Sequence, residues 1–319
     1  MRRLNLILLA IALIFLIWIL NEVGWSTLGR HLIAVGWYFP LILIPYGVVN
    51  WLEAISWKYL LPPPVIRPTI TRLFILRLGG EALNQLTPSA SLGGEAFKAA
   101  RLQAGGVPWE DATASVVIHK GILVLSLALY IFLGLALAPF LLSSPGKGIR
   151  VLLLAAMGLA GAGLLFVFVQ RHGPCGRGIR FLKRRGWCPQ KLAEKEEFFT
   201  TLDERLASFY RNHPGPCALA LTLFFLSWVM HGVEVYLMFW LLGSPLSWAQ
   251  ALALDALAML ITSLAFFIPA AVGAQEGGNI LLALGFNLGV ALGAAFSILR
   301  RLREAFWLIL GLIIVARER

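Results

Sequence analysis

The stretch Pro88-Ser-Ala-Ser-Leu-Gly-Gly-Glu95 interrupts one long apolar region, 69–102. The stretch Pro269-Ala-Ala-Val-Gly-Ala-Gln-Glu276 interrupts a second one, 249–292. When the two stretches are superimposed with a fixed offset of 181, a proline, an alanine and the glutamate align without a gap. Both interrupted regions are therefore interpreted as helical hairpins with a turn near the middle.

A cation follows each of the two glutamates at the same spacing: Lys120 lies as far beyond Glu95 as Arg301 lies beyond Glu276. Overall identity between the two regions is low, so chance similarity is the alternative interpretation. The two regions are nevertheless predicted to enter the membrane from opposite sides, as inverted-topology repeats require. The pattern thus favours an inverted repeat built around two re-entrant hairpins.

The chemistry of the turns suits a ligand. Proline ends a helix, and glycine lets the chain turn and approach a bound group closely. A helix that begins inside a cavity presents free N–H groups, which favour an anion such as phosphate. The alternative is that the glycines merely allow close packing of helices. The predicted turn residues are Pro88, Gly93, Gly94, Pro269, Gly273, Gly277 and Gly278.

Composition defines the environment of the chain. Of its 319 residues, 59% are hydrophobic and only 13% are charged, with a mean hydropathy of +0.80. A soluble domain is about half apolar and a quarter charged, so a soluble enzyme, a disordered protein and a disulfide scaffold are excluded. The formal charge of +11 comes from basic residues clustered between apolar runs, which indicates membrane topology rather than nucleic-acid binding.

The predicted fold is an all-α polytopic integral membrane protein that forms a single domain over 1–319. A full span needs about 20 apolar residues. The basic start and the apolar run after it are interpreted as a retained first span, because no cleavage motif follows. Two complete antiparallel spans are the alternative for 249–292. The candidate full spans, about six, are 4–20, 32–57, 112–142, 150–170, 215–242 and 295–316.

The loop 171–213 orients the chain. It carries ten basic and five acidic residues, which places it, together with both termini, in the cytoplasm and the protein in the inner membrane of a cell. An apolar stripe at helical spacing predicts an amphipathic helix in this loop, lying either on the inner leaflet or against the protein itself. The stripe consists of Leu192, Phe199, Leu202, Leu206 and Phe209.

Ionisable residues within apolar segments are costly and are therefore functional candidates. Arg77 and Glu81 are four apart and Glu95 and Lys98 three apart, so each pair can share a helix face. Asp255, by contrast, is expected at a helix end. Internal ion pairs that only hold the fold are the alternative. The candidate translocation residues are Arg77, Glu81, Glu95, Lys98, Lys120, Glu234, Glu276, Arg300, Arg301 and Glu304.

Once the other embedded ionisable residues, Arg101, Arg303 and Asp255, are counted with these candidates, basic residues outnumber acidic ones, which favours an anionic ligand over a cation. No metal or other cofactor is expected, because the spacing of the set His172, Cys175, Cys188 and His213 fits no common zinc pattern. No G-x-x-x-x-G-K-[ST] sequence occurs, so we do not expect this chain to hydrolyse ATP.

The runs Gly80-Glu-Ala-Leu-Asn84, Pro88 to Glu95, and Pro269 to Gly278 resemble the flippase-like membrane family of the lysylphosphatidylglycerol synthase transmembrane region. The runs Ser297 to Glu304 and His231-Gly-Val-Glu234 are similar to its hopanoid-biosynthesis-associated subfamily. The resemblance covers about 50–316.

The resemblance implies a helical bundle with re-entrant hairpins that moves lipid between leaflets. In the bifunctional members a soluble aminoacyltransferase domain follows the membrane part; we expect this chain to lack that domain, and no enzymatic activity is expected. One rival is a membrane-embedded lipid transferase in which Glu95, Glu276 and His119 act as acid–base groups. Another is a non-catalytic scaffold that binds lipid-synthesis enzymes through the loop 171–213. Lipid is the expected partner, and nucleic acid is not.

Overall fold

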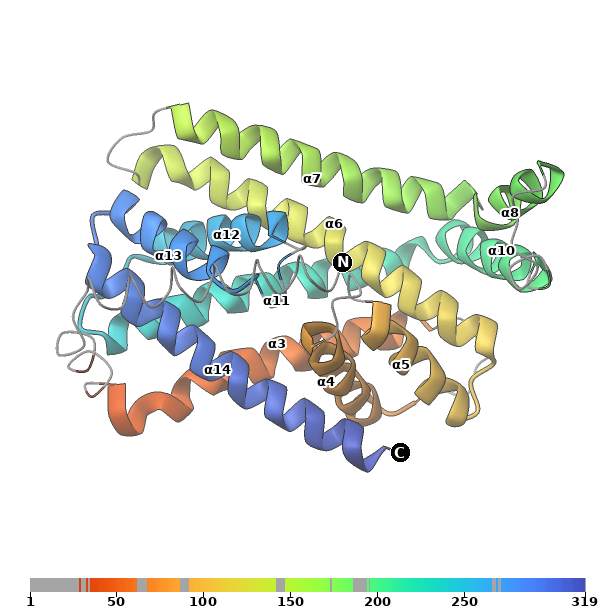
Figure 1. Ribbon diagram of the computed structural model, residues 1–319, viewed down its shortest axis with the longest axis horizontal. Coiled ribbons are helices and arrows are strands. Elements are labelled where there is room, and N and C mark those ends of the chain that lie inside the picture. The colour runs from red at the N-terminus through yellow and green to blue at the C-terminus, as the bar shows by residue number, and fades with distance from the viewer. Residues whose placement is uncertain are drawn as a thin grey trace.

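The computed structural model describes most of the chain beyond residue 34, and the all-helical class predicted from the sequence is confirmed there. Within the described residues the chain forms eleven α-helices, one short 3-10 helix and no strand (Figure 1). The predicted first span 4–20 lies outside these residues, as do Pro88, Leu192 and Pro269. The described residues are 29, 33, 35–61, 68–86, 92–141, 147–172, 174–185, 194, 196–265, 268 and 271–318.

The helices divide into two sets separated by a peripheral segment, α7, α8 and α10. The first set is η1 (Gly36–Tyr38), α3 (Phe39–Tyr59), α4 (Ile70–Leu86), α5 (Leu92–Ala104) and α6 (Trp109–Leu141). The peripheral segment is α7 (Lys147–His172), α8 (Pro174–Arg184) and α10 (Glu196–Asn212). The second set is α11 (Pro214–Leu241), α12 (Trp248–Leu264), α13 (Ala274–Gly285) and α14 (Val290–Arg317).

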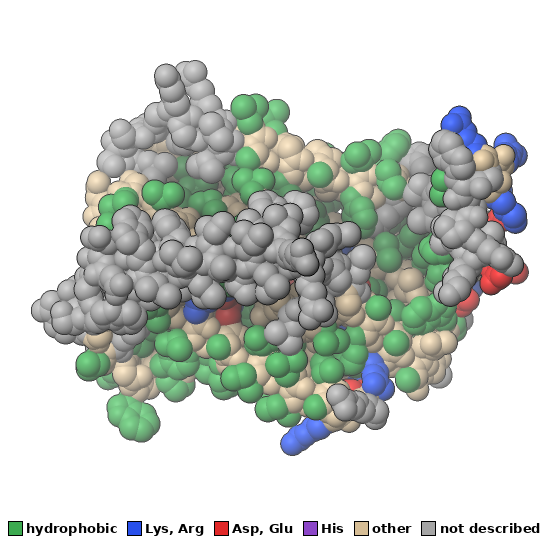
Figure 2. Space-filling model, in the orientation of Figure 1, with side chains coloured by type: hydrophobic (Ala, Val, Ile, Leu, Met, Phe, Trp, Pro, Cys, Tyr) green, Lys and Arg blue, Asp and Glu red, His purple; other side chains and the backbone are tan. Residues whose placement is uncertain are grey.

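Several helices have the length and apolar composition of membrane spans. Three of the described segments meet both criteria, namely Gly36–Tyr59, α6 and α11, and shorter apolar helices occur at Leu154–Val169 and in α12. Outside the grey residues, hydrophobic side chains are spread over the face seen in Figure 2, and several lysines and arginines lie at one end, over α8 and α10. This composition is that of a membrane protein.

The two sets repeat each other along the chain. Adding 181 to the bounds of α5, 92–104, gives 273–285, and α13 runs from Ala274 to Gly285. The same shift carries the first residue of α6, Trp109, onto the first residue of α14, Val290. The offset found in the two turn motifs therefore also relates the helices that surround them.

The helices α3 and α11 form the central contact between the two sets, and they run in opposite directions (Figure 1). Near the start of α3, the ring of Tyr46 lies 5.4 Å from that of His231 in the second half of α11. Near the end of α3, the Ser56 hydroxyl donates to the carbonyl of Ala220, early in α11. Residue numbers thus increase along α3 in the direction in which they decrease along α11, so the two helices are antiparallel.

The α4–α5 hairpin of the first set packs on the long helix α14 of the second set, and the α12–α13 hairpin packs on the long helix α6 of the first set. Helix α4 lies against α14, where Gly311 contacts Ala82, and helix α12 lies against α6, where Gly134 contacts Ala256. A glycine in each long helix lets the backbones approach closely, as small residues do in membrane helices. The two hairpins are thereby held on either side of a shared interior.

The amphipathic helix of the loop 171–213 is α10, and its apolar stripe packs on the protein. Leu202, Leu206 and Phe209 are buried in one cluster with residues of α6 and α11, among them Ile118 and Phe224. Of the two alternatives left open by the sequence, docking on the protein is the one observed for these three side chains.

The end of α14 is fixed to the start of α4 by an ion pair between Arg72 and Glu318, with one nitrogen–oxygen distance of 2.8 Å. Hydrogen bonds from this guanidinium hold the pKa of the Glu318 carboxyl below its ordinary value. A depressed carboxyl pKa contributes stability that is present above about pH 4.3 and is lost as pH falls through the folded-state value.

Glu318→Gln is therefore expected to lower the free energy of unfolding at pH 7 by less than about 1 kcal/mol, because the arginine is partly exposed to solvent. The difference from the wild type should shrink as the pH is lowered below 4. Thermal unfolding in detergent at pH 7 and pH 3.5 measures it. A difference that grows toward acid pH would contradict the assignment.

Candidate functional site

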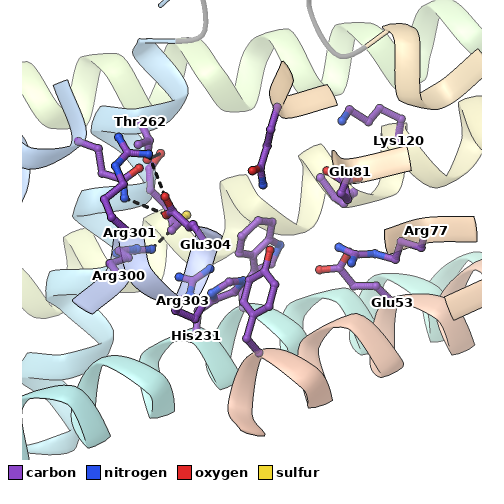
Figure 3. Close-up of a pocket in the computed structure, with 16 residues that line it drawn as sticks. Glu53, Arg77, Glu81, Lys120, His231, Thr262, Arg300, Arg301, Arg303 and Glu304 are labelled. Carbon is purple, nitrogen blue, oxygen red and sulfur yellow. Dashed lines mark hydrogen bonds and ion pairs between the residues drawn. The ribbon is translucent and has the colours of Figure 1, made fainter. Parts of the chain in front are cut away.

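A cavity of about 320 Å³ lies between the two sets of helices, and both contribute to its wall (Figure 3). The first set contributes Tyr46, Glu53, Arg77, Glu81, Gln85, Lys120 and Leu123. The second set contributes Trp228, His231, Met259, Thr262, Gln275, Arg300, Arg301, Arg303 and Glu304.

The charged residues gather at two ends of this cavity (Figure 3). At one end, Lys98 is buried behind the wall, with its Nζ 2.7 Å from Glu95 Oε2 and 3.8 Å from Glu81 Oε1. The Nζ of Lys120 lies 3.6 Å from Glu95 Oε1. Glu95 and Lys98 thus share a helix face, as their spacing predicts, and their ion pair belongs to a network that joins α4, α5 and α6.

Arg77 does not form an ion pair with Glu81, which was the alternative that their spacing left open. Its guanidinium donates instead to Glu53 and Asn50, both on α3. Glu53 and Arg77 are almost fully buried, and a buried carboxylate needs a cation in direct contact. Glu53, on the neighbouring helix α3, is such a buried carboxylate, and Arg77 is the cation in contact with it. Glu81 instead faces the cavity and Lys98.

Arg301 is the centre of the opposite end. Its Nε donates to Glu276 Oε1, and its Nη1 donates to Glu304 Oε2 at 2.8 Å. The other oxygen of Glu304 accepts from Gln275 Nε2 at 2.9 Å. Both glutamates of the turn motifs thus contact the cation that follows them at equal spacing, Glu95 with Lys120 and Glu276 with Arg301.

Asp255 was expected at a helix end, and this prediction is wrong. It lies in the middle of α12, fully buried, where it accepts from Arg300 Nη2 at 2.9 Å and from the Tyr130 hydroxyl at 3.1 Å. The burial of a carboxylate is stabilised here by a cation and a hydrogen bond from two other helices. No spacing within α12 itself reveals these partners.

The third arginine of α14, Arg303, contacts both central helices. Its Nε donates to Glu234 Oε1 of α11 at 2.7 Å, and its guanidinium lies 4.2 Å from the ring centre of Tyr46 in α3. Glu234 Oε2 is also 3.7 Å from His231 Nδ1, so this pair shares one helix face as its spacing of three predicts. The arrangement combines a buried ion pair with a cation–π contact.

The turn glycines are used mainly for close packing. A Cβ added to Gly94 would meet the carbonyl oxygen of Gly80, and one added to Gly278 would lie 2.8 Å from the side chain of Ile261. Gly93 and Gly277 lie in the first turns of α5 and α13. Gly273 has a φ of 82°, a conformation that favours glycine.

The expectation of free N–H groups at the starts of these helices is wrong at the two positions where a partner is observed. Gly94 N–H donates to the Asn84 side chain at 2.8 Å, and Gly273 N–H donates to Glu276 Oε2 at 2.6 Å. Side chains from the hairpins themselves occupy these donors. Anion binding in the cavity would therefore depend on the cationic side chains.

The charge balance differs between the cavity wall and the network behind it. Five cations and three carboxylates line the wall. When their ion-pair partners among the described residues are included, the network holds six cations and seven carboxylates. The cations are Arg77, Lys98, Lys120, Arg300, Arg301 and Arg303. The carboxylates are Glu53, Glu81, Glu95, Glu234, Asp255, Glu276 and Glu304.

Sequence reasoning missed Glu53 and Asn50, because both lie inside an apolar stretch read as a plain span. A signal for them existed. The offset of 181 carries Asn50 onto His231 and Glu53 onto Glu234, so each central helix contains a polar residue followed by glutamate three positions later. The wall residues that were also missed are Tyr46, Gln85, Leu123, Trp228, Met259, Thr262 and Gln275.

His119 does not line the cavity. Its ring is buried between those of Trp57 and Phe224, with centres 5.4 and 5.0 Å away. This position gives no support to the acid–base role considered for it. Among the described residues no group of three or more potential metal ligands occurs, and Cys188 lies outside them.

Apolar helices that enclose a cavity lined with buried ion pairs define a polytopic helical membrane protein with an ionic interior. The chain belongs to the family described as the lysylphosphatidylglycerol synthase TM region, whose model matches residues 5–312. The resemblance at the family level is thereby confirmed.

Two relatives carry the name UPF0104 membrane protein. One, from Methanocaldococcus jannaschii, is 25% identical over 310 residues, which cover 93% of this chain and 89% of the relative. The other, from Methanothermobacter thermautotrophicus, is 26% identical over 263 residues, which cover 74% of this chain and 72% of the relative. No solved structure matches the chain significantly.

Proposed function

We propose that this protein moves a lipid with a polar, anionic head group between the two leaflets of the membrane, without hydrolysing ATP. The observation that carries the proposal is the charged cavity between two helical hairpins in an otherwise apolar bundle. Ionisable groups inside a membrane protein mark substrate or ion pathways, because their burial is costly. The excess of cations on the wall favours an anionic head group.

Alternating access to this cavity follows from an inverted repeat. The helix bounds recur at an offset of 181, the central helices α3 and α11 are antiparallel, and each hairpin packs on the long helix of the other set. In transporters built this way, the site lies between the repeats near the bilayer midplane and one repeat moves against the other. We assign α4–α5 and α12–α13 to the two hairpins that enter the membrane from opposite sides.

In this proposal the protein lies in the inner membrane, with its termini and the loop 171–213 in the cytoplasm. Transport is downhill, coupled to an ion, or driven by a partner protein. A cargo of the hopanoid type, suggested by the subfamily resemblance, would need a charged or phosphate-bearing head to match the cavity wall.

Translocation in liposomes tests the function. Acyl-labelled phosphatidylglycerol is incorporated with the purified protein, and the fraction reached by a membrane-impermeant quencher is followed over time. We expect transfer in the wild type and at least about tenfold slower transfer in Glu95→Gln, Glu276→Gln and Arg301→Ala, which corresponds to ~1.4 kcal/mol in the barrier.

The controls are Glu197→Gln and Arg184→Ala, two exposed residues of α10 and α8 far from the cavity wall. They should transfer lipid at the wild-type rate. If the folded wild type moves none of several anionic phospholipids, or if all five variants behave alike, the proposed function or its site is contradicted.

A further inference from the structure

Two glutamates bind Arg301, and they differ in what else they do. Glu276 is almost fully buried, and its second oxygen caps α13 through the N–H of Gly273. Glu304 lines the cavity with 21% of its side chain exposed, and apart from Arg301 it contacts the side chain of Gln275. Glu276 is thus part of the fold, whereas Glu304 can leave Arg301 without uncapping a helix.

The internal repeat also distinguishes Glu276 from Glu304. The offset of 181 carries Glu95 onto Glu276 and Lys120 onto Arg301, so one carboxylate–cation pair is common to both halves. It carries Leu123 onto Glu304, and both of these residues line the cavity. Glu304 is therefore an additional carboxylate at one end of the cavity, where the other end has an apolar side chain.

Two arginines that line the cavity with Glu304 have unused hydrogen-bond donors. Nη1 of Arg300 and Nη2 of Arg301 are buried and have no hydrogen-bond partner among the described residues, and both arginines line the cavity. An unpaired buried donor is costly, more so when it is charged. Two guanidinium groups that line one cavity and have free donors match the several oxygens of a phosphate group.

We propose that Glu304 is an internal competitor for a phosphate-binding site formed by Arg300 and Arg301. In the empty protein Glu304 occupies the position on Arg301 that a phosphate oxygen takes. When a phosphate-bearing head group enters, the Glu304 carboxylate leaves Arg301 and takes up one proton. This inference rests on the proposed function and names its substrate class: lipids whose head group contains a phosphate.

The charge balance of the network is the reason why Glu304 takes up a proton. Because six cations and seven carboxylates already lie on or behind the wall, a further negative charge in a poorly solvated cavity is unfavourable unless one carboxylate is neutralised. Glu304 is the carboxylate that the incoming phosphate displaces. The titratable and charged groups that line the cavity with Glu304, or pair with its neighbours on α14, are Tyr46, Glu53, Arg77, Glu81, Lys120, His231, Glu234, Asp255, Glu276, Arg300, Arg301 and Arg303.

Binding of short-chain dihexanoyl phosphatidylglycerol to the purified protein in detergent, measured by calorimetry from pH 5.5 to 8, tests the inference. This phosphodiester does not titrate in that range, so a pH dependence reports on the protein. The wild type should bind more tightly at pH 5.5 than at pH 8. Glu304→Gln should bind about tenfold more tightly than the wild type at pH 8 and show little pH dependence, since the competing charge is gone.

Arg301→Gln should weaken binding, and Glu197→Gln on α10 should match the wild type at every pH. A second arm with inorganic phosphate at pH 7 separates the two sources of the phosphate group: binding as tight as that of the lipid would assign the site to free phosphate and overturn the lipid assignment. Weaker or unchanged binding of phosphatidylglycerol by folded Glu304→Gln would overturn the competitor role. Liposome transfer that persists in that case would leave the proposed function standing.

Discussion

Replacing Gly94 with alanine is expected to disrupt the first hairpin and to lower the free energy of unfolding by about 3 kcal/mol or more. The added methyl group would collide with the carbonyl oxygen of Gly80 and lie 2.5 Å from Asn84 Oδ1. The first is a backbone atom inside α4, and the second accepts the N–H of Gly94 itself. The backbone oxygen cannot move away without separating α5 from α4, and movement of the Asn84 amide would break its hydrogen bond with Gly94. Thermal unfolding in detergent and the yield of monodisperse protein measure the effect.

Gly161→Ala provides the matched control. Gly161 lies on the exposed face of α7, and an added methyl group there would have nothing within 4 Å. Alanine is favoured over glycine inside a helix by up to about 1 kcal/mol, so this variant should be as stable as the wild type or slightly more stable. Equal stability of both alanine variants would show that α4 and α5 do not pack as closely as described.

Arg303→Met is expected to cost about 3–5 kcal/mol of stability, because it leaves Glu234 buried without its cation. The ion pair is 2.7 Å long, and both side chains are at most 4% exposed. Methionine retains much of the apolar volume, so the loss reports mainly on the charge. The midpoint of thermal unfolding, with tryptophan fluorescence as the probe, measures it.

The double variant Arg303→Met/Glu234→Met should recover more than half of that loss, because it removes both charges together. Lys183→Met serves as a comparison on the surface. It breaks an exposed ion pair with Glu196 and should leave the unfolding midpoint almost unchanged. Losses that simply add in the double variant would contradict a direct coupling between Arg303 and Glu234.

The sequence identified the members of the repeated pairs, because they depend on position along the chain, but it did not predict that they are in contact. Glu95 and Glu276 align at the turn motifs, and the cations that follow them at equal spacing, Lys120 and Arg301, contact them. Pairs within one helix, such as Glu95 with Lys98, were predictable from helical spacing alone. Apolar stretches likewise predicted most of the helices.

Pairs between helices were not predictable in the same way. Arg77 binds Glu53 rather than Glu81, and Asp255 binds Arg300 across the bundle. Which helix face meets which depends on packing of small residues at helix crossings, such as Gly134 against Ala256. A single sequence records the spacing within each helix but not the rotation of one helix against another.

Across the contact between α3 and α11, each half of the chain supplies polar or aromatic partners to charged groups of the other half. Ser227 of α11 donates to the buried Glu53 of α3 at 3.3 Å, and Tyr46 of α3 lies against Arg303 and His231 of the second half. Tyr46 and Ser227 are themselves related by the offset of 181. Each half thus solvates charges that the other half places where water is scarce. A change on one side of this contact therefore has to be judged by its effect on the charges of the opposite repeat.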